Sequence, residues 1–148
     1  MGEKCWRTYD MSVNGLPQKI RYNADTVEGL FLPLLRRLTE MQRAAARRIL
    51  VFLAAPPATG KSTLLLFLAQ LAQEHEEFTR VQALGMDGFH HPNRYLETHS
   101  ILRDGVETPL KSIKGAPETF DVAHLAAKLA AAKEGATPFP VYDRRIHD

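Results

Sequence analysis

The sequence predicts an α/β fold, and three observations support this prediction. The apolar run over residues 49–53 has no polar alternation, which is typical of a strand buried on both faces of a parallel sheet. A leucine-rich helix is expected directly after it, from Ser62 to about Glu74. A second short strand is expected over residues 80–86, and the order strand, helix, strand is characteristic of α/β domains.

An N-terminal hairpin and a helix are expected to precede this core. Residues 8–22 contain two short strand-like runs around Asn14-Gly15, whose residue types tolerate the positive φ of a tight turn. Residues 26–48 are expected to be helical, because apolar residues recur there every three or four positions: Leu30, Leu34, Leu38 and Met41. Pro33 has no backbone N–H, so we expect it to kink this helix or to mark its first turn.

Two further segments follow the second expected strand. The polar stretch over residues 87–118 is expected to be a loop with short helical pieces, and loops of this length are usually functional. A helix is expected over residues 121–134, where Asp121 can cap the N-terminus and Gly135 ends the helix. The buried stripe of this helix is expected to consist of Val122, Leu125 and Leu129.

Composition narrows the class of protein. The chain of 148 residues has the size of one domain, which we divide into a leader over residues 1–48 and a domain over residues 49–148. A formal net charge of +2 does not call for a nucleic-acid partner or an anionic membrane. Cys5 is the only cysteine, so an internal disulfide is impossible and a reducing compartment fits best. Without a long apolar span or a secretory signal, we expect a cytoplasmic enzyme or binding domain.

A phosphate-binding motif lies between the first expected strand and its helix. Residues 55–62 match the phosphate-loop (Walker A) pattern of Gly, four residues and Gly-Lys-Ser, except that Ala55 replaces the first glycine. In such loops, backbone N–H groups and the helix N-terminus bind phosphate oxygens. Lys61 would neutralise the β- and γ-phosphates, and the Ser62 hydroxyl would bind Mg²⁺. The predicted ATP-binding residues are Ala55, Ala58, Thr59, Gly60, Lys61, Ser62 and Thr63. The alternative is a chance Gly-Lys-Ser at a helix start.

A carboxylate follows the second expected strand. Ligands in open α/β sheets bind beyond the carboxyl ends of the strands, so we expect Asp87 to face the same crevice as Lys61. There its carboxylate could accept the proton of an attacking hydroxyl group. An isolated Asp-Gly pair is, by itself, more typical of a turn.

Four motif blocks, in this order, resemble the phosphoribulokinase, uridine kinase and pantothenate kinase family of small-molecule kinases. The blocks are the phosphate loop, Asp-Gly-Phe-His at 87–90 with Asn93 and Leu96, residues 114–121, and residues 140–143 with His147. The resemblance is greatest to the nucleoside or nucleotide kinase-like branch, and it extends to the leader over residues 31–38.

The resemblance implies transfer of the ATP γ-phosphoryl group to a hydroxyl of a small metabolite such as a nucleoside, a pantothenate-like compound or a sugar-like compound. ATP and Mg²⁺ are the implied cofactors, and Asp87 and Lys61 are the implied catalytic residues. The substrate-binding residues predicted here are His90, Asn93, Lys114, Tyr142 and His147. Lys114 lies where pantothenate kinases have Arg-Lys-Gly, but Ile113 replaces the arginine, which argues against pantothenate itself.

The resemblance also implies a three-layer α/β/α phosphate-loop fold with a parallel sheet, truncated before the third core strand and the lid. Faces of the first strand would then be exposed, which favours a homo-oligomer. A non-catalytic nucleotide-binding remnant, or a half-domain completed by another chain, is the alternative. A nucleoside-triphosphatase switch is a third hypothesis, and we do not expect partners among nucleic acids or membranes.

Overall fold

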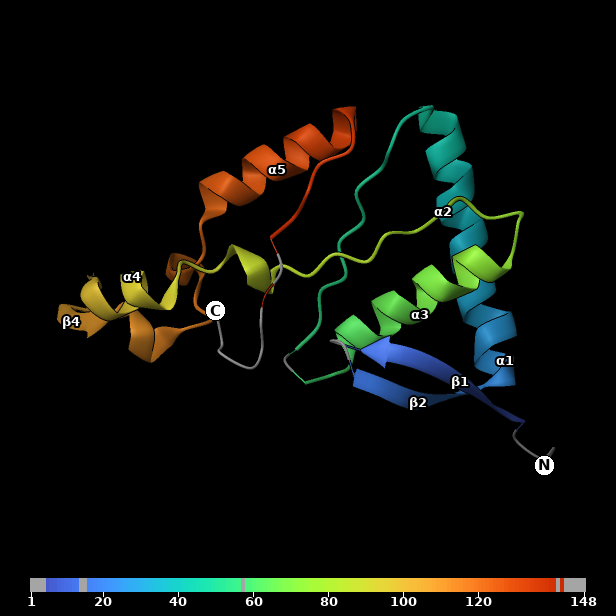
Figure 1. Cartoon of the computed structure of the whole chain (residues 1–148), viewed down its shortest axis with the longest axis horizontal. Coiled ribbons are helices and arrows are strands. Elements are labelled where there is room, and N and C mark those ends of the chain that lie inside the picture. Colours follow the sequence, from blue (N-terminus) through green and yellow to red (C-terminus); the bar gives the residue numbers. More distant parts are fainter. Residues whose placement is uncertain (1–4, 14–15, 57, 141, 143–148) are drawn as a thin grey trace. The chain divides into compact units, whose positions relative to one another are not determined.

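A computed structural model describes residues 5–13, 16–56, 58–140 and 142 of the chain (Figure 1). The chain forms two compact units, residues 1–84 and residues 85–148, which are described separately. The first unit contains β1 (Trp6–Val13), β2 (Leu16–Asn23), α1 (Ala24–Thr26), the π-helical turn η1 (Val27–Phe31), α2 (Leu32–Ala45) and α3 (Lys61–Glu74). The second contains η2 (Asp87–Phe89), α4 (Asn93–Thr98), β3 (Ser100–Arg103), β4 (Val106–Pro109), η3 (Leu110–Ile113), η4 (Pro117–Thr119) and α5 (Val122–Glu134).

The N-terminal hairpin is confirmed. Strands β1 and β2 pair antiparallel, from Trp6 opposite Asn23 to Val13 opposite Leu16. The predicted turn at Asn14-Gly15 lies outside the described residues. Met11 and Val13 alternate with exposed residues on β1 and are buried, as expected for a strand with one face on a core.

The helix after the hairpin is confirmed, although it ends at Ala45 rather than at residue 48. The side chain of Asn23 caps its start by accepting a hydrogen bond of 2.8 Å from the backbone N–H of Asp25. Pro33 lies in the first turn of α2, directly after the π-helical turn, where the Leu32 N–H donates to the Val27 carbonyl. Because Pro33 cannot donate to the carbonyl four residues before it, the helix changes its hydrogen-bond pattern at this point.

The core of the first unit is built around Phe67 on α3, which is 0% exposed. Its ring lies 4.6 Å from that of Tyr9, 4.2 Å from that of Tyr22 and 5.7 Å from that of Phe31. The hairpin therefore packs on α3 through aromatic rings, and burial there raises the pKa of Tyr22. The helix predicted from Ser62 to Glu74 is confirmed and begins one residue earlier.

The two predicted parallel strands are not observed. Residues 49–53 and residues 80–86 have no strand assignment, and Val51 and Phe52 are 58% and 73% exposed. A strand needs a neighbour that accepts and donates its backbone hydrogen bonds, and no described strand pairs with either run. In the described residues the sheets are two antiparallel hairpins, β1–β2 and β3–β4, so a three-layer fold with a parallel sheet is not seen. The structure is α/β only in the coarser sense that it combines helices with small sheets.

The stretch over residues 87–118, predicted to be a loop with short helical pieces, also contains a hairpin. Strands β3 and β4 pair antiparallel around Asp104 and Gly105, whose φ angles are 51° and 79°. Two successive positive φ angles are typical of a type I′ turn, whose backbone twist matches that of the two strands it connects. Asp-Gly is a favoured residue pair for this turn. The Asp104-Gly105 dipeptide is therefore the feature of the sequence from which this hairpin could have been predicted.

Helix α5 is confirmed with its caps. The Asp121 carboxylate accepts a hydrogen bond of 2.8 Å from the His124 N–H, and the Gly135 N–H donates to the Ala131 carbonyl. Its predicted buried stripe was wrong at Val122, which is 60% exposed, whereas Ala132 is buried. Among the described residues, no helix combines the length and the apolar character needed to cross a membrane.

Candidate functional site

The loop before α3 positions an open helix N-terminus. Gly60 is the N-cap residue with a φ of 84°, a conformation that glycine adopts without steric cost. No side chain of the described residues caps the first turn of α3, in which Lys61, Ser62 and Thr63 follow Gly60. The first backbone N–H groups of a helix have no partner inside the helix, so this end can bind an anion. Ala58, which occupies a position that is often glycine in such loops, also has a positive φ of 61°.

Lys61 lies over its own loop. Its ammonium nitrogen donates hydrogen bonds of 2.7 Å to the carbonyl oxygens of both Ala55 and Pro56. The Thr59 hydroxyl donates to the same Pro56 carbonyl at 2.8 Å. The structure thus brings together three of the predicted ATP-binding residues, Ala55, Thr59 and Lys61. The Lys61 ammonium group lies next to the open N-terminus of α3. Together with the exposed Ser62 hydroxyl, these groups fit a bound polyphosphate, and Ser62 is the residue there that could bind its Mg²⁺.

Four of the five predicted substrate-binding residues form a cluster in the second unit. The Asn93 side-chain oxygen accepts a hydrogen bond of 2.9 Å from the Lys114 ammonium group, which lies 5.4 Å from the centre of the Tyr142 ring. The Tyr142 and His90 ring centres are 5.9 Å apart. These residues come from three segments of the chain, because His90 and Asn93 lie close together in the sequence. The fifth, His147, lies outside the described residues.

Backbone hydrogen bonds hold two of these segments side by side. The His91 N–H donates to the Thr119 carbonyl at 2.9 Å, and the Asp121 N–H donates to the Phe89 carbonyl at 2.8 Å. Thr119 is fully buried. Its hydroxyl donates a hydrogen bond to the Ala116 carbonyl and accepts one from the Gly115 N–H. The segment before α5 is therefore joined to residues 89–91 by backbone hydrogen bonds.

His90 presents a defined hydrogen-bonding face. Its Nδ1 lies 2.8 Å from the backbone carbonyl of Asp87, and because a carbonyl only accepts, Nδ1 carries the hydrogen. In the neutral imidazole the other ring nitrogen, Nε2, is then an acceptor; it is buried and has no hydrogen-bond partner in the part of the chain that the structure describes. The ring lies against that of Phe120, with a centre-to-centre distance of 3.8 Å and an angle of 33° between the ring planes. A ligand with an N–H or O–H group would satisfy Nε2.

Asp87 is the first residue of η2, and its side chain is exposed. Its backbone carbonyl also accepts from the His90 N–H at 3.2 Å, so Asp87 and His90 belong to one local turn. Lys61 belongs to the first unit and Asp87 to the second. The expectation that both face one crevice therefore stays a prediction.

Replacing Gly88 by alanine is expected to destabilise the second unit by about 1–3 kcal/mol. A Cβ atom at Gly88 would collide with the backbone carbonyl of Pro140, whose carbon would lie only 2.8 Å away. Chemical unfolding followed by far-UV circular dichroism would measure the loss. Gly85→Ala is the matched control, because a Cβ there meets nothing within 4 Å. Equal stability of the two variants would contradict the close approach.

One residue of the cluster was missed by sequence reasoning. The Lys111 ammonium nitrogen donates a hydrogen bond of 2.8 Å to the same Asn93 oxygen that Lys114 contacts, and it lies 3.3 Å from a carboxylate oxygen of Glu97. The spacing of three residues between the two lysines, on a 3₁₀ turn, was the available signal.

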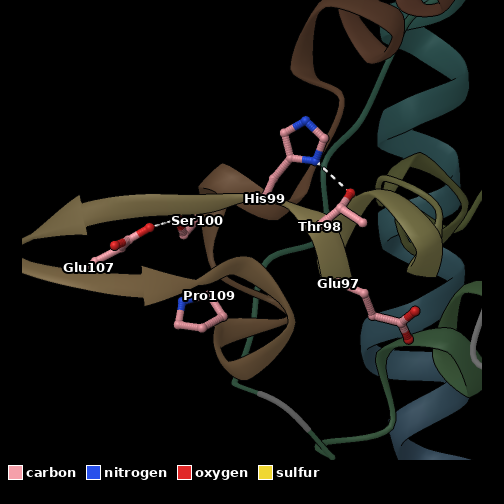
Figure 2. Close-up of a pocket in the computed structure, with 6 residues that line it drawn as sticks. All are labelled: Glu97, Thr98, His99, Ser100, Glu107 and Pro109. Atoms are coloured by element: carbon pink, nitrogen blue, oxygen red, sulfur yellow. Dashed lines mark hydrogen bonds between the residues drawn. The ribbon is translucent and has the colours of Figure 1, made fainter.

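An open hollow lies between the end of α4 and the β3–β4 hairpin (Figure 2). It is lined by Glu97, Thr98, His99, Ser100, Glu107 and Pro109. Two of its polar groups bond to each other, since the Ser100 hydroxyl donates to the Glu107 carboxylate at 2.6 Å. None of the predicted site residues that the structure describes lines this hollow. Across the described part of the chain, no group of three or more His, Cys, Asp or Glu side chains could hold a metal ion.

Comparison with known proteins relates the chain to kinases. The pantothenate kinase of Yersinia pestis (strain Pestoides F) is 30% identical over 142 residues, which cover 84% of this chain and 42% of that kinase. The chain is a distant homologue of pantothenate kinases. The same values hold for the pantothenate kinase of Yersinia pseudotuberculosis serotype O:1b (strain IP 31758).

A more similar protein is the uncharacterized protein YggC of Escherichia coli (strain K12), which is 44% identical over 140 residues. That alignment covers 94% of this chain and 55% of YggC, so the chain spans about half the length of the curated relatives it matches. No family model matches the chain. No solved structure matches it either.

Proposed function

We propose that the chain is the nucleotide-binding part of an ATP-dependent phosphotransferase that acts on a hydroxyl group of a small metabolite. The observation that carries this proposal is the uncapped N-terminus of α3, with Gly60 at a positive φ and the Lys61 ammonium beside it. The distant homology to pantothenate kinases supports the kinase class. The proposed boundary between a leader (1–48) and a kinase-like domain (49–148) belongs to the same hypothesis.

Each part of the chain has a distinct role in this proposal. The N–H groups at the start of α3 bind phosphate oxygens, and Lys61 exchanges the Ala55 and Pro56 carbonyls for phosphate. Bound ATP with Mg²⁺, held in part by Ser62, supplies the γ-phosphoryl group. Asp87 accepts the proton of the attacking hydroxyl. The acceptor itself is held by His90, Asn93, Lys114, Tyr142 and His147.

Asp87→Asn is expected to slow phosphoryl transfer by about 10²- to 10⁴-fold, the usual contribution of a general base, and to leave ATP affinity unchanged. The fold should survive, because Asp87 holds His90 through its backbone carbonyl, which asparagine keeps. Turnover would be measured as ADP released from ATP with a panel of hydroxylated metabolites. Asp104→Asn, at the β3–β4 turn where φ is 51°, is a matched control that asparagine tolerates. Equal turnover in both variants would reject Asp87 as the base.

A second candidate is a non-catalytic nucleotide-binding half that another chain completes. The apolar run over residues 49–53 favours it, because Phe52 is 73% exposed and no described strand pairs with the run. Size-exclusion chromatography with light scattering distinguishes the two. A monomer that transfers phosphate supports the kinase alone, whereas a homo-oligomer that binds ATP without turnover supports the second candidate. Neither proposal includes a nucleic-acid or membrane partner.

A further inference from the structure

We propose that the exposed side of η1 and α2 is a contact surface for a second copy of this chain, with the two α2 helices packed antiparallel. The surface belongs to the first unit and contains none of the residues assigned above to ATP or to the metabolite. The inference therefore goes beyond the proposed function and does not depend on it.

The segment formed by η1 and α2 carries two apolar stripes, and the first unit covers one of them. The covered stripe lies in the core together with side chains of α3 and consists of Val27, Phe31 and Leu35. The exposed stripe consists of Leu30, Leu34 and Met41, which are 57%, 39% and 47% exposed. Single exposed apolar residues are common on protein surfaces, whereas a continuous stripe of them indicates an interaction surface.

The spacing of the exposed stripe indicates that its partner is a helix. Leu30 and Leu34 are four residues apart, and Met41 follows Leu34 after seven. Apolar residues at these spacings line one side of a helix, where the side chains of a second helix can pack between them.

The exposed stripe matches itself when the second helix runs in the opposite direction. A two-fold axis beside residues 37 and 38 places Leu34 opposite Met41 of the second copy, and Leu30 opposite Ala45, which is also exposed. The two long side chains then meet in the middle of the contact, and the leucine at each end meets a small alanine. Because the contact is symmetric, each of these pairs occurs twice.

The charges along the segment favour the same arrangement. In the antiparallel pair, Glu28 near the start of one segment lies opposite Arg47 directly after α2 of the other, and both side chains are exposed. Glu28 accepts a hydrogen bond of 2.9 Å from Arg7 through one carboxylate oxygen, and its other oxygen can accept a further bond. In the middle, Arg37 is ion-paired with Glu40 of its own helix at 3.4 Å, which reduces repulsion between the two copies of Arg37.

Sedimentation velocity of the full chain at rising protein concentration tests the proposal. We expect a dimer with a dissociation constant of about 1–100 μM, because two short helices form a small interface. Leu34→Glu and Met41→Glu should each raise this constant by roughly tenfold or more, since each places a carboxylate in an apolar contact twice. The matched control is Phe52→Glu, which also changes an exposed apolar residue of the first unit and should leave the dimer unchanged.

Charge reversal tests the antiparallel alignment. Glu28→Lys and Arg47→Glu should each weaken the dimer by about two- to tenfold, because each reversal puts like charges opposite each other at both ends. An equimolar mixture of these two variants should associate as the unmodified chain does. In the mixed dimer, the new lysine of one copy lies opposite the arginine-to-glutamate change of the other, and the remaining arginine lies opposite the remaining glutamate.

Three results would overturn the proposal. The first is a chain that stays monomeric at every concentration, and the second is a dimer that Phe52→Glu dissociates but Leu34→Glu and Met41→Glu do not. The third is a mixture of the two charge variants that associates no better than either variant alone. Circular dichroism of each variant excludes unfolding as the cause. ATP binding and turnover are separate measurements, so their failure would reject the proposed function and leave this contact standing.

Discussion

Lys61→Ala is expected to lower the affinity of the chain for ATP by roughly ten- to hundredfold, because a hydrogen bond to a charged group contributes about 1.5–3 kcal/mol. Among the described residues, the hydrogen-bond acceptors of the Lys61 ammonium group are the backbone carbonyls of Ala55 and Pro56, each at 2.7 Å. Phosphate oxygens are stronger acceptors than neutral carbonyls, so polyphosphate binding should draw the ammonium group away from them. Isothermal titration of ATP with Mg²⁺ would measure the affinity.

Two variants make the ATP titration specific. Lys133→Ala removes an exposed lysine at the end of α5 and should leave ATP affinity unchanged. Lys61→Arg keeps the charge but changes the shape of the donor, so partial binding is expected. If Lys61→Ala binds ATP as tightly as the unmodified chain, the loop before α3 is not the nucleotide site.

Phe67→Ala is expected to destabilise the first unit by about 3–5 kcal/mol, the usual cost of removing a buried aromatic ring. Phe67 is 0% exposed and lies in the middle of the rings of Tyr9, Tyr22 and Phe31. Alanine would leave a cavity that the hairpin and α2 could fill only by moving toward α3. Urea unfolding followed by tryptophan fluorescence measures this unit, because Trp6, the only tryptophan, lies on β1.

The matched control is Phe52→Ala. Phe52 is 73% exposed, so its removal should change the free energy of unfolding by less than about 0.5 kcal/mol. A comparable loss in both variants would mean that Phe52 packs against other residues in solution. That result would contradict the exposure of residues 49–53 and would favour an assembly in which this run is covered.

The elements that the sequence predicted correctly depend on local interactions. The N-terminal hairpin was predicted from two short strand-like runs around Asn14-Gly15, and α5 from Asp121 at its N-cap and Gly135 after its end. Likewise, Pro33 marks the start of α2 because its missing N–H disrupts the helix pattern only within one turn. In each case the residues that decide the structure are close together in the sequence.

The predicted parallel strands failed for the opposite reason. The runs over residues 49–53 and 80–86 have strand-like composition, but a strand exists only where a distant segment supplies its backbone hydrogen bonds. Val122 was wrong for a related reason. Helical spacing identifies one apolar face, but which end of that face is covered depends on what packs against it.

For the candidate site, the sequence by itself determined which reactive residue types are available, and the tertiary structure decided which of them lie together. The motifs predicted His90, Asn93, Lys114 and Tyr142 one at a time as substrate-binding residues, and this role stays a prediction. Only the fold placed Lys111 against Asn93 and buried a His90 nitrogen that no described residue satisfies. These facts depend on hydrogen bonds between segments far apart in the chain, which no local pattern encodes.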